Sequence, residues 1–188
     1  MGKKLSEMSL EELWQLFPIF LVPHDDAWKL WYENEEQRIL TILPHGISAR
    51  ISHIGSTAIP GIYAKNIVDI MLEVTKTDDL YAVSEILQNN GWICMNRAEK
   101  RISLNKGYTE NGFAEKVFHL HLRLQGDNDE LYFRDYLVEY SDAAKEYEEM
   151  KLHLWKQYEH DRDGYTMAKG SFIQKYTEKA REHYCMKY

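Results

Sequence analysis

A Gly-Ser turn and a strand aspartate are the residues of this chain whose types and spacing most clearly indicate chemistry. The turn is Gly55-Ser56-Thr57, and Asp69 follows inside an apolar run from residue 67 to 74. A glycine lets the backbone come close to an anion, and a hydroxyl beside it adds a donor. A carboxylate in such a strand is costly to bury unless it is paired or binds a cation. These residues indicate a site for a phosphorylated ligand with a metal ion, although a plain turn with a salt-bridged acid would give the same pattern.

Two histidines form a second candidate group. His119 and His121 occupy alternate positions in the segment 117–124, so both rings lie on one face if that segment is a strand. They could contact a shared ligand, and metal binding is one use because histidine is the commonest metal ligand. Half-buried histidines that face helices are the simpler alternative.

Several basic residues lie near these motifs and could bind phosphate. Lys65 is the strongest candidate, because it follows a Pro-Gly turn and precedes the strand of Asp69. We expect Lys65 and at least one of Arg50, Arg101 and Arg123 to line a locally positive cleft. The simpler alternative is a solvated surface, which is the usual position of lysine and arginine.

Hydrophobic periodicity predicts an α+β fold, with a sheet region at about 48–124 and a helical C-terminal part at about 127–183. In the strand 67–74, Asp69, Met71 and Glu73 share a face, and the other face is apolar. The alternating Glu and Lys of 145–151 predict a solvated helix face. Strands are expected at 48–54, 67–74, 92–95, 101–105 and 117–124, a polar loop at 107–112, and helices at 9–17, 25–43, 78–90, 128–140, 142–159 and 163–183.

Length and composition narrow the class of protein. A chain of 188 residues with 44% hydrophobic residues fits a single domain spanning 1–188. The net charge of −7 argues against general nucleic-acid or anionic-membrane binding. No apolar run reaches membrane-spanning length, and Cys94 and Cys185 form no CxxC motif. We therefore expect a cytoplasmic protein with reduced thiols.

Several separated motifs resemble the GrpB family, also called UPF0157. The motifs are His-Ile-Gly-Ser-Thr-Ala-Ile-Pro-Gly (53–61), Ala-Lys (64–65), Ile-Val-Asp-Ile (67–70), His-Leu-His (119–121), Phe-Arg-Asp-Tyr-Leu (133–137) and Tyr-Thr-x-Ala-Lys (165–169). They occur in the same order as in the family, over roughly residues 20–178. The resemblance implies a nucleotidyltransferase-like fold of the DNA polymerase β type, with a mixed sheet flanked by helices and a helical C-terminal third.

The resemblance also implies a mechanism. Two Mg²⁺ or Mn²⁺ ions would be held by strand acids, and the Gly-Ser turn would cradle a nucleoside triphosphate. Asp69 matches the first metal ligand, and Lys169 could close the pocket from above. The second acid is expected at position 71, where this chain has Met71. Glu73 lies on the same face but is displaced by roughly 7 Å along the strand.

The third acid is also absent from its expected strand, which presents His119 and His121 instead. Imidazoles suit Zn²⁺, Mn²⁺ or Fe²⁺ better than Mg²⁺. The main hypothesis is a protein that binds a nucleotide or related phosphorylated small molecule, with metal-dependent nucleotidyl transfer as its reaction if it is an enzyme. Two alternatives stay open: a catalytically degenerate binding or accessory module, and a metal-dependent hydrolase that uses Asp69 and the two histidines.

Overall fold

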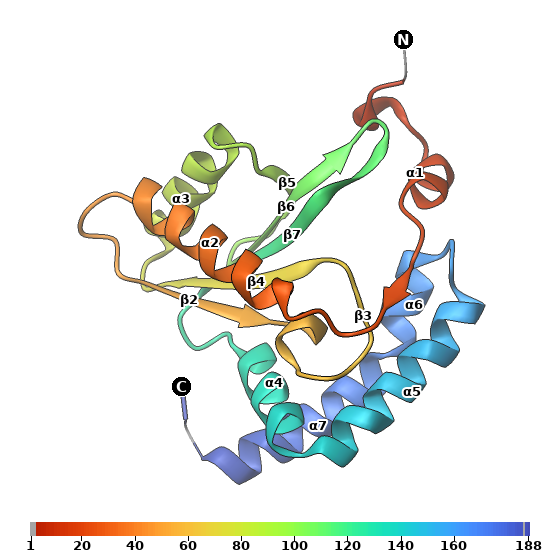
Figure 1. Ribbon diagram of the computed structural model, residues 1–188. Coiled ribbons are helices and arrows are strands. Elements are labelled where there is room, and N and C mark those ends of the chain that lie inside the picture. Colours follow the sequence, from red (N-terminus) through yellow and green to blue (C-terminus); the bar gives the residue numbers. More distant parts are fainter. Residues whose placement is uncertain (1–2, 186) are drawn as a thin grey trace.

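A five-stranded mixed sheet forms the centre of the protein (Figure 1). The computed structural model describes residues 3–185 and 187–188. The elements are η1 (Leu5–Glu7), α1 (Leu10–Leu16), β1 (Leu21–Val22), α2 (Ala27–Ile42), β2 (Ala49–Ile54), η2 (Ser56–Ala58), β3 (Ala64–Lys65), β4 (Val68–Val74), α3 (Thr77–Asn89), β5 (Ile93–Arg97), β6 (Arg101–Thr109), β7 (Gly112–Leu124), α4 (Asp129–Glu139), α5 (Ser141–Gln157), α6 (Arg162–Ala168) and α7 (Gly170–Tyr184).

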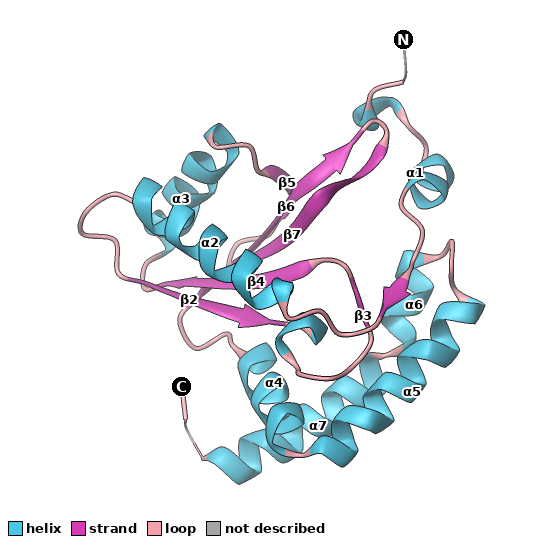
Figure 2. Ribbon diagram, in the orientation of Figure 1, coloured by secondary structure: helices cyan, strands magenta, loops and turns pink. Residues whose placement is uncertain are grey.

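The strand order in the sheet is β2-β4-β7-β6-β5. β4 runs parallel to β7, and the other neighbouring pairs are antiparallel. Helices α2 and α3 lie on one side of the sheet and α4 to α7 on the other (Figure 2). The α+β class and the mixed sheet flanked by helices are therefore confirmed. No helix among the described residues is long and apolar enough to cross a membrane.

The alternation of β4 separates the two sides of the sheet. Val68, Ile70 and Leu72 are fully buried in the main core, which also includes Trp28 of α2. Met71 is fully buried on the opposite side, in a small cluster with Ile54 and Leu131. The predicted division of this strand into two faces is confirmed, and it directs Asp69 toward the C-terminal helices.

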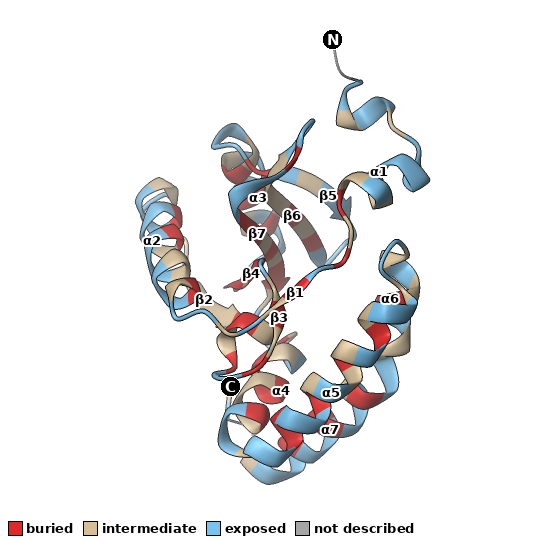
Figure 3. Ribbon diagram, turned by 45° about the vertical axis from the view of Figure 1, so that its right-hand side comes forward, coloured by how far each residue is buried: buried red, intermediate tan, exposed pale blue. Residues whose placement is uncertain are grey.

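A second core holds those helices together. It joins α4, α5 and α7 through a cluster that includes Phe133, Tyr147 and Phe172. Ile59 and Ile62, from the loop after the Gly-Ser turn, belong to the same cluster. The buried residues of these helices lie on their inward faces (Figure 3). The loop thus ties the turn to the C-terminal helices.

Two sequence predictions were wrong in detail. The expected loop at 107–112 is part of a long hairpin, because the ladder between β6 and β7 continues to the pair Thr109 and Gly112. The expected helix at 163–183 is divided into α6 and α7 at Lys169. Gly170 follows the break, and glycine is a poor helix former. The two-residue ladder between β1 and β3, which pairs Leu21 with Lys65, is too short to leave a periodic signal.

Truncating a buried side chain of β4 tests the assignment of the main core. We expect Leu72→Ala to lower the free energy of unfolding by about 2–5 kcal/mol, because it removes buried contacts and leaves a cavity. Leu40, on α2, is 47% exposed, so Leu40→Ala is the control and should change stability by about 0.5 kcal/mol or less. Urea denaturation measures both. Equal losses in the two variants would contradict the assignment.

Candidate functional site

A cleft of about 910 Å³ lies between the sheet and the C-terminal helices. This volume falls within the range of roughly 300–1,000 Å³ that is typical of small-molecule sites. The candidates from the sequence that line it are Gly55, Ser56, Thr57, Lys65, Asp69, Arg101, His119, His121 and Lys169. Strands β2, β4 and β7 supply the turn, the acid and the histidines, whereas α5, α6 and α7 form the opposite wall.

Strand register brings Asp69 and the two histidines together. In the parallel pair of β4 and β7, Asp69 lies opposite His119, and Met71 lies opposite His121. One carboxylate oxygen, Oδ1 of Asp69, is 3.3 Å from His119 Nδ1 and 3.4 Å from His121 Nε2. The two imidazoles therefore converge on a single acceptor.

The outer nitrogens of both rings fix their tautomers. Arg123 Nη2 is 3.3 Å from His121 Nδ1, and a guanidinium can only donate. Nδ1 of His121 is therefore the acceptor, and its Nε2–H donates to Asp69. Tyr108 Oη is 2.7 Å from His119 Nε2 and accepts from Arg162 Nη2 at 3.0 Å. The tyrosine hydroxyl then donates to Nε2, so His119 presents Nδ1–H to Asp69.

This arrangement holds Asp69 as a carboxylate. Burial by itself raises the pKa of Asp69, but the hydrogen bonds from His119 and His121 outweigh it and keep the pKa well below its ordinary value. Burial also lowers the pKa of His119, and the nearby Asp69 opposes that change only in part. Asp69 thus faces the cleft as a carboxylate that accepts from both imidazoles, and Asp129, Glu130, Asp163 and Glu178 also line the cleft.

The glycine of the turn has a specific steric role. Ile54 pairs with Asp69 in the ladder between β2 and β4, so Gly55 is the next residue beside that carboxylate. A methyl group at Gly55 would lie 3.0 Å from Cβ and Cγ of Asp69 and closer still to Oδ2. Thr57 has a different role, because its hydroxyl is 2.9 Å from His53 Nε2 and supports the turn.

The residues around Asp69 do not fit the two-ion site that the resemblance implied. Met71 occupies the position of the second acid and is fully buried. Glu73 is 2% exposed, and Arg50 Nε donates to its carboxylate at 2.5 Å. Glu73 therefore forms an internal ion pair with Arg50 and does not line the cleft.

The histidines do not provide a substitute for the missing acids. A metal-bound histidine normally donates its second ring N–H to an acceptor. Here the second nitrogen of His121 faces Arg123, which is a donor and favours the tautomer that carries a proton toward Asp69. Within residues 3–185 and 187–188, no group of three His, Cys, Asp or Glu side chains could hold a metal ion.

Three lysines line the cleft, Lys65 on β3, Lys151 on α5 and Lys169 between α6 and α7. Lys65 and Lys169 lie with Nζ 5.9 Å and 4.4 Å from the ring centroid of Tyr165. Lys151 Nζ lies 4.7 Å from the ring of Tyr147 and donates to the Tyr63 carbonyl. The close contacts of these ammonium groups are with rings and a carbonyl, and none of the three forms a salt bridge within the described part of the chain, although Glu148 attracts Lys151 from farther away.

Burial and mutual repulsion lower the pKa values of these lysines. Desolvation, with repulsion from Lys169, lowers the pKa values of Lys65 and Lys151 to about 7. Desolvation lowers the pKa of Lys169 to about 8. An anion placed among the three ammonium groups would remove this repulsion and restore their protonation.

Lys151 was not among the candidates from the sequence. It was placed on a solvated helix face, yet it is 1% exposed in the structure. The signal was present in the helical spacing, because Tyr147 and Leu154 are four residues before and three residues after it, and both are buried. Arg162, at the first position of α6, also lines the cleft and was missed.

Of the three arginines expected near the cleft, Arg101 lines it and Arg50 and Arg123 do not. Arg50 pairs with Glu73, its partner in the ladder between β2 and β4. Arg123 is 6% exposed, and its Nη1 donates to the Leu122 carbonyl. Arg101 does line the cleft, and its guanidinium pairs with Asp127.

The family model described as GrpB protein matches residues 18–179. This chain belongs to the GrpB family. The glutamate-rich protein GrpB of Alkalihalophilus pseudofirmus is 32% identical over 161 residues, which cover 82% of this chain and 91% of that relative. The UPF0157 protein YqkA of Bacillus subtilis is 28% identical over 184 residues, which cover 95% of this chain but 52% of YqkA. The chain thus spans about half the length of that second relative.

A crystal structure supports the same assignment. The conserved protein GrpB from Enterococcus faecalis superposes with a TM-score of 0.75 at 25% sequence identity. The match covers 88% of this chain and 99% of the Enterococcus chain. The residues matched by the family model, 18–179, include the Gly-Ser turn, β4 and β7.

Two glycine substitutions isolate the contact between the turn and Asp69. Gly55 and Gly61 have similar φ values, +72° and +78°, but an added Cβ meets nothing within 4 Å at Gly61. Gly61→Ala should cost about 1–2 kcal/mol of unfolding free energy, from backbone conformation alone. Gly55→Ala should cost more, because the methyl group must also displace the Asp69 carboxylate. Chemical denaturation compares the variants, and equal costs would refute the contact.

Proposed function

We propose that this GrpB-family protein binds a phosphorylated small molecule of nucleotide size in the cleft. The observation that carries the proposal is the set of Lys65, Lys151 and Lys169, three ammonium groups in one cleft with no carboxylate among their close contacts. Grouped ammonium ions are costly unless an anion joins them, and phosphate supplies two negative charges and several acceptors. Arg162 adds a further cation to the cleft.

Asp69 provides a second polar group in the cleft, in addition to the lysines. Its side chain is 26% exposed, and Oδ1 already accepts from two imidazoles. The remaining oxygen can accept a hydrogen bond from a hydroxyl of the ligand. A ligand with phosphate at one end and hydroxyl groups farther along, as in a sugar phosphate or a nucleotide, would pair with both the lysines and Asp69.

The proposal concerns binding rather than a metal-dependent reaction. The second acid is replaced by buried Met71, and Glu73 is committed to Arg50. The hydrolase alternative lacks support because both nitrogens of His119 and His121 take part in the network around Asp69. In this arrangement neither of these two rings has a nitrogen left over to bind a metal or activate water. The geometry therefore favours a phosphate-binding module in which lysines balance the ligand charge.

Lysine substitutions test this function. We expect wild-type protein to bind ATP and inorganic triphosphate in the presence of EDTA, as measured by isothermal titration calorimetry. Lys169→Met should weaken both by about tenfold or more, a loss of about 1.4 kcal/mol, because an ammonium in contact with phosphate is removed. Lys151→Met should act in the same direction. Lys145→Met is the matched control, since Lys145 is exposed on the same helix as Lys151.

The control should bind both probes with affinity within about twofold of wild type. Melting temperatures establish that each variant is folded before binding is compared. Absence of saturable binding to wild type, or wild-type affinity in both Lys151→Met and Lys169→Met, would overturn the proposal.

The lowered lysine pKa values predict a pH dependence of binding. Lys65 and Lys151 have pKa values of about 7, and Lys169 of about 8, so they lose protons between pH 6 and 9. An anion binds the protonated lysines and raises their pKa values, so the complex holds more protons than the free protein. The dissociation constant for triphosphate should therefore rise from pH 7 to pH 9, and binding should take up protons. An affinity that is constant or improves over this range would contradict the prediction.

A further inference from the structure

A second cavity, which we call the side pocket, lies against the cleft and has a volume of about 260 Å³. It shares Lys65, Ile67 and Arg162 with the cleft, so these residues form a common wall between the two spaces. Its remaining walls come from the segment around β1, from the link between β3 and β4, and from the start of β7. The volume is below the range of about 300–1,000 Å³ that is typical of complete sites, so the side pocket can take only part of a ligand.

The lining of the side pocket is mainly apolar. Ile19 and Val117 are each 1% exposed and form a buried floor. Phe20 and Phe113, which are 58% and 38% exposed, add two aromatic side chains to the lining. Asn66 contributes an amide whose Oδ1 accepts from Trp28 Nε1 at 2.7 Å, which leaves the amino group as a donor. Apolar surfaces with one polar edge are complementary to a planar aromatic ring that carries an acceptor.

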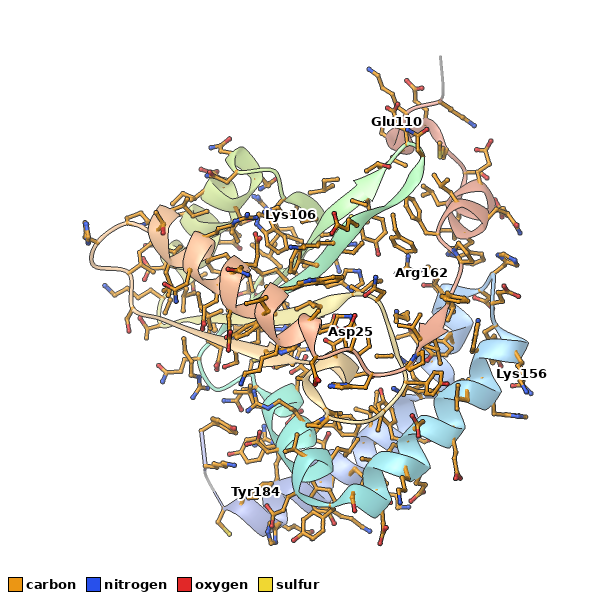
Figure 4. All side chains as sticks on the ribbon, viewed as in Figure 1. Asp25, Lys106, Glu110, Lys156, Arg162 and Tyr184 are labelled. Atoms are coloured by element: carbon orange, nitrogen blue, oxygen red, sulfur yellow. The ribbon has the colours of Figure 1, made fainter. Side chains whose placement is uncertain are left out.

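The common wall carries the positive charges that connect the two spaces. Lys65 is held in β3 by its pairing with Leu21 of β1. Arg162 begins α6, and its guanidinium lies 5.7 Å from the ring centroid of Tyr108 while donating to the hydroxyl of that tyrosine. It lies between the β6–β7 hairpin and the C-terminal helices (Figure 4). A phosphate bound at this wall would leave its substituent free to enter the apolar space.

We infer that the side pocket binds an aromatic group of the phosphorylated ligand, such as a nucleobase, while its phosphates lie in the cleft. The inference rests on the proposed function and names the chemical class of the ligand. A phosphorylated ligand without an aromatic group would use the cleft alone. The ligand favoured by both cavities is therefore a nucleotide rather than a simple sugar phosphate or polyphosphate.

A substitution that fills the side pocket distinguishes binding in that pocket from binding in the cleft. Ala114 is exposed, lies in β7 and lines the side pocket but not the cleft. Ala114→Leu should weaken ATP binding by about tenfold and leave inorganic triphosphate within twofold of wild type. Ala114→Ser keeps the pocket open and is the matched control, with wild-type affinity for both probes. Isothermal titration calorimetry measures the four affinities after melting curves have established that both variants are folded.

Truncating an aromatic side chain that lines the side pocket provides an independent measurement. Phe20→Ala, at an exposed position, should also weaken ATP and spare triphosphate. If wild type binds ATP no more tightly than triphosphate, or if Ala114→Leu and Phe20→Ala leave ATP affinity unchanged, the side pocket does not hold an aromatic group. Those results leave phosphate binding in the cleft intact. Failure of wild type to bind either probe would instead overturn the proposed function, and this inference with it.

Discussion

The carboxylate of Asp69, held by two imidazole donors beside a glycine turn, is the interaction on which the site depends. The parallel register of β4 and β7 places His119 and His121 within reach of the same oxygen. Arg123 donates to the second nitrogen of His121. Arg162 donates to Tyr108, whose hydroxyl donates to the second nitrogen of His119. A charge can remain in this partly buried position because every donor around it is oriented by a further hydrogen bond.

The cleft brings this acid and three buried lysines into one space. The main core sits on the far side of the sheet, a separate core joins the C-terminal helices, and the cleft lies between the two. Lys65, Lys151 and Lys169 converge there, with pKa values lowered by burial. Such an arrangement costs free energy in the empty protein, and that cost falls when an anion binds. Stability and ligand binding are therefore coupled at this site.

The residues beside Asp69 on β4 have structural rather than ligand-binding positions. Met71 fills a small apolar cluster with Ile54 and Leu131. Glu73 is buried with Arg50, which holds β2 against β4 at the end away from the turn. Neither residue can approach the cleft without leaving a core. The packing beneath the sheet thus leaves Asp69 as the one strand acid of β4 that faces the ligand space.

Much of this arrangement could be predicted from the sequence, because it depends on local periodicity. The alternation in β4 and β7 placed Asp69, His119 and His121 on defined faces, and the Gly-Ser turn could be placed between two strands. Only the tertiary structure decided which charged residues face the cleft. Arg50 turned to an internal partner because strand register, which local sequence does not encode, brought Glu73 beside it. Arg123 is buried, donates to the Leu122 carbonyl and contacts His121, two positions before it on β7. Lys151 became part of the site because its helix face packs against the loop at Tyr63, a contact between residues 88 positions apart.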